Sequence, residues 1–170
     1  MDPALREARH DAAEDPATSP GRRFTWSFQV RFMDLNPSGH LDNLQILRAV
    51  DEARHRLLGV REPGGPPVLS GLIDGAPIQV TMLVAAHRVE YRRELWLSSD
   101  PLELTLWVCR VGGSSFDVAT EVRQSTGAPV AALAVTTVVL MDPSVGAAWA
   151  LSDPIRAALA AYSGPAPAFR

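Results

Sequence analysis

Residues 24–58 read FTWSFQVRFMDLNPSGHLDNLQILRAVDEARHRLL, and the spacing of their apolar residues changes along the way. The first part alternates apolar and polar residues, which predicts a strand with one buried face: Phe24, Trp26, Phe28, Val30 and Phe32. From Leu44 to Leu58 the apolar residues fall on one stripe of a helix: Ile46, Val50, Ala53 and Leu57. Asp42 and Asn43 suit the N-cap of this helix, and Gly59 suits its end.

Four strand-like runs follow the helix, at residues 80–91, 102–111, 114–124 and 130–141. Ser152-Asp153-Pro154 then indicates the start of a short helix, with proline in its first turn. One long helix after the first strand, followed by four strands in a meander, predicts an α+β class. The simplest packing lays the apolar stripe of the helix on the concave face of a curved antiparallel sheet of about five strands.

The composition narrows the class of protein. A chain of 170 residues suits one domain, and its net charge of −3, without a basic tract, argues against a nucleic-acid partner. Cys109 is the only cysteine, so no internal disulfide can form. Without a signal-like or membrane-spanning apolar run, we expect a cytoplasmic protein with no membrane partner. Residues 1–22 are predicted to be a flexible arm, residues 23–162 the domain, and residues 163–170 a flexible tail.

The connection FMDLNPSGHLDN, residues 32–43, gathers polar side chains between the strand and the helix. Its residue types are those of any tight turn or helix cap, so a purely structural role is one interpretation. The other is a catalytic site. N–H groups at a helix start can stabilise a developing oxyanion, and a carboxylate beside a histidine can fix its tautomer.

The order of elements resembles the hotdog fold, in which a curved sheet wraps one long helix. DLNPSGHLDN, with DEAR at residues 51–54, is similar to the D-x-D-x-x-G-H-x-N-N and E-E-A-R patterns of the acyl-CoA thioesterase group related to hydroxybenzoyl-CoA thioesterase. VEYRREL, VGGSSFDVATEV and VVLMD resemble later segments of that group, so the resemblance covers residues 24–162. It implies hydrolysis of an acyl-CoA or acyl-carrier-protein thioester. The open edges of such a sheet predict a homodimer or homotetramer. The sequence has no ligand cluster with metal spacing, so we expect no metal and no cofactor.

Asn36 stands where the thioesterase pattern has its usual catalytic carboxylate, and an amide cannot act as a base. We therefore expect His40 to be the general base or to position water, Asn36 to hold the water or the carbonyl, and Asp34 to orient one of them. The residues expected to bind substrate are Ser38, Gly39, Leu41, Asp42, Asn43, Arg92, Ser114 and Ser115. Arg93, beside Arg92, is a further candidate for the phosphates of coenzyme A.

Two alternative functions stay open. The same segment resembles D-x-N-P-x-H-x-D of the R-specific enoyl-CoA hydratases, although one extra residue separates Asp34 from His40 here. A non-catalytic thioester-binding protein is the other alternative, because Asn36 lacks the acid. For Asp51 on the helix we expect a solvated position or an ion pair with Arg48 or His55, and Cys109 should be a small core residue.

Overall fold

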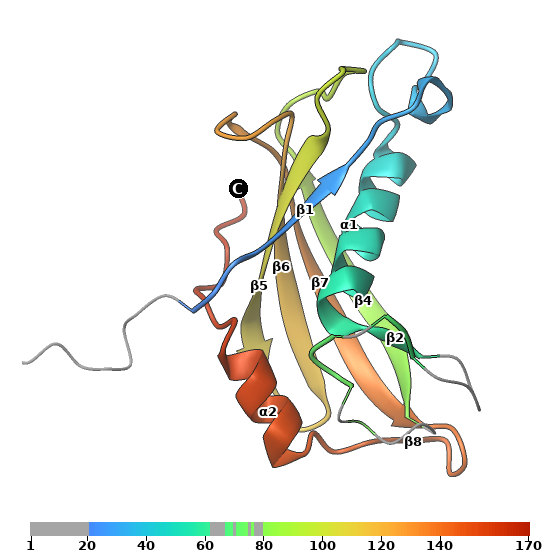
Figure 1. Ribbon diagram of the computed structural model, residues 1–170, viewed down its shortest axis with the longest axis vertical. Coiled ribbons are helices and arrows are strands. Elements are labelled where there is room, and N and C mark those ends of the chain that lie inside the picture. The colour runs from blue at the N-terminus through green and yellow to red at the C-terminus, as the bar shows by residue number, and fades with distance from the viewer. Residues whose placement is uncertain (1–20, 62–66, 70, 75, 77–79) are drawn as a thin grey trace, which may run out of the picture.

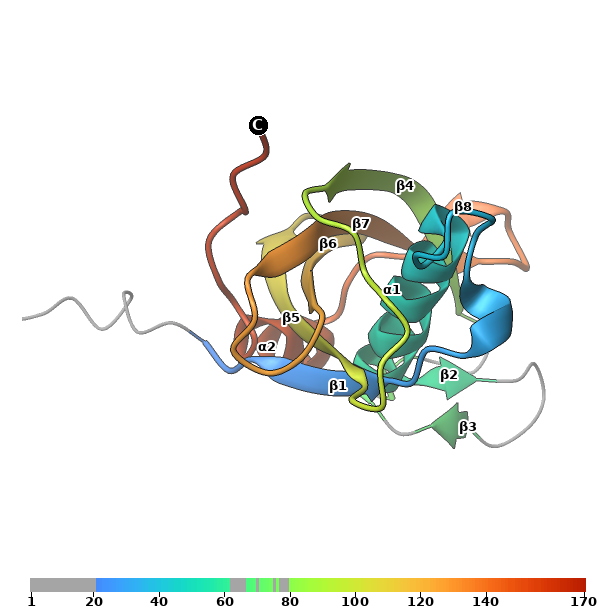
Figure 2. The same cartoon turned by 90° about the horizontal axis from the view of Figure 1, so that it is seen from above.

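The computed structural model describes residues 21–61, 67–69, 71–74, 76 and 80–170, so most of the predicted N-terminal arm lies outside the described residues. A six-stranded antiparallel sheet curves around one long helix (Figure 1, Figure 2). The strand order is β1 (Phe24–Phe28), β5 (Leu102–Val111), β6 (Ser115–Arg123), β7 (Val130–Asp142) and β4 (Thr81–Tyr91), with β8 (Ala147–Ala148) beside β7. Two further strands pair only with each other, β2 (Val60–Arg61) and β3 (Pro67–Leu69). The predicted hotdog arrangement is confirmed.

The long helix, α1 (Asn43–Leu58), begins one residue before the predicted start. The Asp42 carboxylate accepts the Leu44 N–H at 2.8 Å and caps the helix, and Gly59 follows it with a φ of 91°. All members of the predicted apolar stripe are buried: Ile46, Val50, Ala53 and Leu57. They face strand residues that lie on the concave side of the sheet, among them Leu102, Leu104, Leu106 and Val108 of β5.

The first strand is shorter than predicted. It ends at Phe28, and residues Phe32–Asp34 form a turn of 3₁₀ helix instead of continuing the strand. The turn forms because the Asp34 carboxylate accepts the backbone N–H of Arg31 at 2.8 Å, which bends the chain away from the sheet. Val30 stays buried, but Phe32 is 75 % exposed, so the prediction that Phe32 belongs to the buried face is wrong.

The two edges of the sheet differ. On one edge, β1 covers only the first half of β5, and the predicted short helix, α2 (Asp153–Ala160), is confirmed beside the second half. There the Val108 N–H donates to the Tyr162 carbonyl, and the Gly164 N–H donates to the Val108 carbonyl, both at 2.9 Å. On the other edge, β4 is solvent-accessible along most of its length.

No helix in the described part of the chain is long and apolar enough to cross a membrane.

Residues 163–170 cross the outer face of the sheet, which is the face opposite α1 (Figure 2). The Trp107 indole N–H donates to the Pro165 carbonyl at 2.8 Å, and Arg92 donates to the Ala168 carbonyl at 2.8 Å. The Arg170 N–H donates to the Glu90 carboxylate at 2.6 Å. The flexibility expected for this segment stays a prediction, but its path in the structure is defined by these contacts.

Candidate active site at the start of the long helix

Backbone hydrogen bonds close the connection between β1 and α1 into a compact loop. The Asn36 N–H donates to the His40 carbonyl, and the Gly39 N–H donates back to the Asn36 carbonyl, each at 2.9 Å. Pro37 follows Asn36 in this turn, and Gly39 adopts a φ of 87°, which favours glycine. The Leu41 N–H donates to the Leu95 carbonyl at 2.7 Å, and Leu41 is buried. The loop therefore holds His40 beside the first turn of α1.

Asn36 and His40 are in direct contact. The Asn36 side-chain nitrogen lies 3.1 Å from both ring nitrogens of His40. If the Asn36 nitrogen lay in the plane of the ring at this distance from both ring nitrogens, it would overlap with ring carbon atoms of His40. The amide therefore lies over the imidazole face. The Asn36 Oδ1 accepts the Ser38 N–H at 2.9 Å, an Asx turn. One end of the Asn36 side chain thus holds the turn, and the other supports the His40 ring.

The edges of the His40 ring have different partners. Nδ1 lies 3.3 Å from the Leu41 carbonyl, and a proton on Nδ1 would satisfy that oxygen. In this tautomer Nε2 keeps an in-plane lone pair that can take a proton. The Trp96 ring meets the imidazole edge to face, with 5.9 Å between the ring centroids. Trp96 is a lone aromatic residue in the loop between β4 and β5, and the sequence analysis did not identify it as part of the site.

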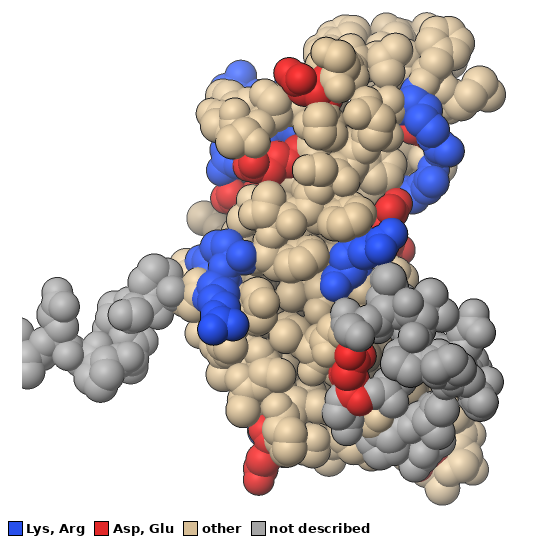
Figure 3. Space-filling view, viewed as in Figure 1, with Lys and Arg blue, Asp and Glu red and all other residues tan. Residues whose placement is uncertain are grey.

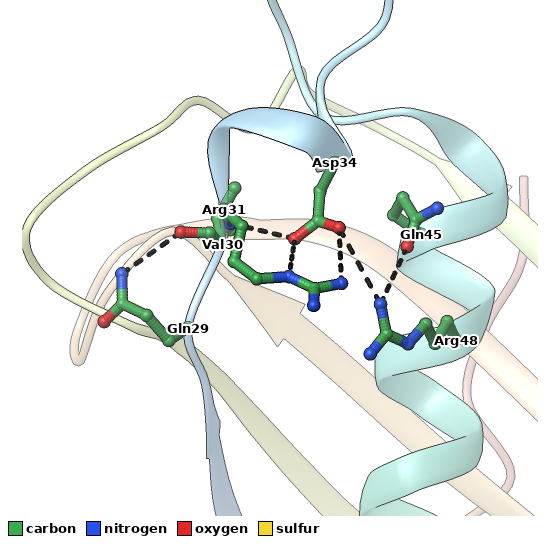
Figure 4. A network of polar contacts seen from close by, with 6 residues as sticks. All are labelled: Gln29, Val30, Arg31, Asp34, Gln45 and Arg48. Carbon is green, nitrogen blue, oxygen red and sulfur yellow. Dashed lines mark hydrogen bonds and ion pairs between the residues drawn. The ribbon is translucent and has the colours of Figure 1, made fainter.

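Asp34 is buried, but it faces a pair of arginines (Figure 4). Its carboxylate accepts hydrogen bonds from the Arg31 guanidinium at 2.9 and 3.2 Å, and Arg48 of α1 lies 3.7 Å away. The hydrogen bonds from the Arg31 side chain hold the pKa of Asp34 below its ordinary value, against the opposing effect of burial. Within the described residues, no polar contact joins Asp34 to Asn36 or His40. The structure therefore brings together two of the three predicted catalytic side chains.

Replacing Asp34 by asparagine should lower the free energy of unfolding by about 1–3 kcal/mol, as expected when a buried group loses charged hydrogen bonds. Because the pKa of Asp34 is lowered on folding, the stability that it contributes is complete above its ordinary value and is lost as the pH falls through the folded value. The wild type should therefore lose more stability in acid than Asp34→Asn, measured by urea unfolding across that pH range. Equal losses in the two proteins would contradict this assignment.

A cavity of about 250 Å³ lies between the start of α1 and the end of β4. It is lined by His40, Leu41, Asn43, Ile46, Tyr91, Arg92, Arg93, Glu94 and Leu95. Tyr91 is 3.5 Å from the Asn43 carbonyl, and burial raises the pKa of its phenol. On the face shown in Figure 3, the tip of the molecule beyond the start of α1 is mostly uncharged, whereas basic side chains lie along the edge beside the first turns of α1. Exposed apolar side chains lie in this region, at Phe32, Met33 and Leu44.

The predicted substrate-binding residues fall into two groups. Leu41, Asn43 and Arg92 line the cavity, Ser38 and Gly39 form the adjoining turn, and Asp42 caps α1. Ser114 and Ser115 lie elsewhere, because β5 starts beside Phe28 of β1 and runs ten residues to the turn that contains Ser114 and leads into β6 at Ser115. At about 3.3 Å per residue, that strand places them roughly 30 Å from its other end. In one chain the structure does not bring them to His40.

The two arginines at the end of β4 point in different directions. Both backbone N–H groups donate to the Ala131 carbonyl, a local irregularity that separates the two side chains. The Arg92 guanidinium donates to Glu90 at 2.6 Å and to the Ala168 carbonyl on the outer face. The Arg93 side chain is exposed, and no acidic partner contacts it in the part of the chain that the structure describes. Arg93 is therefore the more available cation at the cavity.

The other residues considered in the sequence analysis, Asp51 and Cys109, lie away from the cavity lined by His40. Asp51 pairs with the buried Arg54 at 3.0 Å, instead of with Arg48 or His55, and lies 3.9 Å from His87. Cys109 is only half-buried and lies outside the core cluster, so the prediction that it is a core residue is wrong. Partial burial raises the pKa of its thiol, which disfavours the reactive thiolate. No cluster of three or more metal-ligating side chains occurs among the described residues.

Comparison with known proteins identifies similar chains. A model of the thioesterase-like superfamily matches residues 30–159, whereas no curated protein matches the chain. A predicted thioesterase from Bacillus stearothermophilus is similar in structure, with a TM-score of 0.70, 18 % identity, and coverage of 86 % of this chain and 100 % of that one. A 1,4-dihydroxy-2-naphthoyl-CoA thioesterase from Synechocystis has a TM-score of 0.62, 20 % identity, and coverage of 81 % and 96 %.

A third structure is a thioesterase from Thermus thermophilus complexed with coenzyme A and Zn. Its TM-score with this chain is 0.60 at 25 % identity, and the alignment covers 79 % of this chain and 95 % of that one. The similarity spans nearly the whole of each of these proteins, so the chain shares their fold.

Proposed function

This chain belongs to the thioesterase-like superfamily, and we propose that it hydrolyses an acyl thioester of coenzyme A or of a carrier protein at the start of α1. The observation that carries the proposal is the cavity that His40 lines beside the first turn of the helix. A thioester carbonyl placed there meets a base, a helix dipole and an apolar wall.

In the proposed reaction, Nε2 of His40 takes a proton from water as the water oxygen attacks the carbonyl carbon. The carbon–sulfur bond then breaks, and the departing thiolate takes that proton from the imidazolium. Asn36 supports the ring from its face, so that Nε2 stays directed away from the loop. Asp34 acts indirectly, as a positioning residue that holds the loop through Arg31 and Arg48.

The developing oxyanion needs a hydrogen-bond donor, and we assign this role to the Asn43 N–H. It is the first N–H of α1, and no acceptor contacts it among the described residues. The positive end of the helix dipole lies at the same place, so a negative oxygen is stabilised there. Arg93, rather than Arg92, is the residue proposed to meet the phosphates of coenzyme A.

We further propose a homodimer in which the β4 edges of two chains pair into one continuous sheet. One edge of β4 has no partner among the described strands, and exposed apolar side chains occur along this strand, including Leu83, Val84 and Tyr91. Open strand edges favour pairing. The cavity lies at the end of the same strand, so a partner would help to enclose it. Sedimentation equilibrium should give twice the mass of one chain, and a monomer would refute the paired sheet.

Because the lone cysteine requires no oxidising compartment, we keep the cytoplasm as the proposed location.

The decisive experiment is a panel of acyl-CoA thioesters, with each acyl group also supplied as its N-acetylcysteamine thioester. Free thiol released from at least one substrate supports hydrolysis. Loss of the enoyl absorbance without thiol release would instead establish the hydratase, and saturable binding without either reaction would establish a non-catalytic binding protein. A panel in which the coenzyme A esters are the better substrates would support the role of Arg93.

A further inference from the structure

The loop between β4 and β5, residues 92–101, lies beside the connection between β1 and α1 as a short antiparallel pair. Trp96 and His40 are opposite one another in this pair, and the carbonyl of the buried Leu95 accepts the Leu41 N–H at 2.7 Å. Opposite residues of an antiparallel pair project to the same side, so the two aromatic rings meet, with 78° between their planes. The contact of Trp96 with the imidazole is therefore set by the position of the Trp96 backbone.

The side chain of Gln124 holds the Trp96 backbone from another part of the chain. Gln124 is the first residue after β6, and its Oε1 accepts the Trp96 N–H at 2.8 Å, while its Nε2 donates to the Trp96 carbonyl at 3.0 Å. These two hydrogen bonds are here called the clamp. One planar amide satisfies both backbone groups of a single residue, which requires a donor and an acceptor in the same side chain.

Burial does not hold Trp96 in place. Its exposed fraction is 48 %, whereas that of its neighbour Leu95 is 1 %. The other contacts described for the His40 ring, with Asn36 and with the Leu41 carbonyl, come from the same short loop as the ring itself. Trp96 is therefore the contact that ties the ring to the rest of the domain, and the clamp fixes Trp96.

We propose that Gln124 is a positioning residue, which keeps the His40 imidazole in its reactive orientation by clamping Trp96. The inference rests on the proposed function, because it concerns the base of that reaction. Neither Gln124 nor Trp96 is among the described residues that line the cavity beside His40. The clamp should therefore affect the rate of the chemical step and leave substrate binding unchanged.

Gln124→Met tests the proposal, because it keeps the length of the side chain and removes both hydrogen bonds to Trp96. It should lower kcat about 10-fold at an unchanged KM, measured by thiol release, since a base that loses its alignment is less often in the reactive geometry. Gln124→Glu keeps an acceptor for the Trp96 N–H but no donor, so it should give an intermediate kcat. A folded Gln124→Met protein with the wild-type kcat would overturn the proposal.

Gln29→Met is the matched control. It removes a hydrogen bond from another glutamine to the same loop, the bond from Gln29 Nε2 to the Ser98 carbonyl at 3.2 Å, and it leaves the clamp intact. It should keep the wild-type kcat. An equal loss in Gln29→Met and Gln124→Met would show that any loosening of the loop lowers the rate, and would overturn a specific role for Gln124.

A double-mutant cycle tests whether Gln124 acts through the Trp96 ring. Trp96→Ala removes the ring and keeps the backbone groups to which Gln124 binds. If the clamp serves only to place the ring, adding Gln124→Met to Trp96→Ala should lower kcat no further. Losses that multiply in the double variant would show that the two residues act independently, against the proposal.

Fluorine NMR of protein labelled with 5-fluorotryptophan tests the clamp without turnover. The chain has four tryptophans, and the Trp96 signal is the one that disappears in Trp96→Phe. Gln124→Met and His40→Ala should each shift this signal, because each removes a neighbour of Trp96. An unmoved signal in Gln124→Met would overturn the clamp itself. A shifted signal in a protein that releases thiol from no substrate would overturn the role in hydrolysis, and with it the proposed function, while the clamp stands.

Discussion

Replacing His40 by alanine should lower the rate of thioester hydrolysis about 10²–10⁴-fold, the usual contribution of a general base. The imidazole is the only group lining the cavity, among the described residues, that combines a free in-plane lone pair with support on its face and its edge. Its removal takes away the proton acceptor nearest the first turn of α1, while the loop keeps the backbone hydrogen bonds that close it. The measurement is initial thiol release, with a thermal unfolding curve as the check on folding.

His55→Ala serves as the matched control, because His55 lies in the last turn of α1, far from the cavity. It should keep the wild-type rate. A folded His40→Ala protein that hydrolyses the same substrate at the wild-type rate would remove His40 from the mechanism and leave only a structural role for its contacts.

Replacing Asn36 by aspartate should also lower the rate, by about 10²-fold, the order seen when one preorganised donor is lost. The carboxylate can still accept the Ser38 N–H, so the turn should fold as before. The amide donors over the imidazole face are lost, however, and a negative charge takes their place. That charge favours the protonated ring, which cannot act as a base, and it lies close to the developing oxyanion.

The dependence on pH separates the two explanations for Asn36. If the added charge keeps His40 protonated, the rate of Asn36→Asp should recover at higher pH. The rise in its rate with pH should then occur at higher pH than the same rise in the wild type. If Asn36 marks a decayed thioesterase, the restored carboxylate should raise hydrolysis well above wild type near neutral pH. A large gain of this kind would refute the role assigned to Asn36.

The parts of the fold that depend on local periodicity could be predicted from the sequence. The change of apolar spacing within residues 24–58 located both β1 and α1, because burial of one face demands a different period in each. The end of β1 could not be located in this way. The alternation continues through Phe32, but the contact between Arg31 and Asp34 turns the chain away from the sheet there. The spacing of apolar residues cannot predict such a contact between polar side chains.

The arrangement of the candidate site could be predicted where it depends on the short loop, but not where it depends on the sheet. Asn36 and His40 meet because only four positions separate them in one turn. Arg92 turns to the outer face because of an irregularity at the end of β4, and Ser114 lies at the far end of β5. Both placements follow from pairing between strands that are distant in the sequence. The Trp96 contact with His40 was missed for the same reason.

Pro37, which follows Asn36 in the turn, has a consequence for the chemical ageing of the protein. Asparagine converts spontaneously to aspartate when the backbone nitrogen of the next residue attacks the side-chain amide and forms a cyclic imide. The nitrogen of proline is already substituted and carries no hydrogen, so this route is blocked at Asn36. The amide over the imidazole should therefore be protected from this route of conversion to aspartate during prolonged storage.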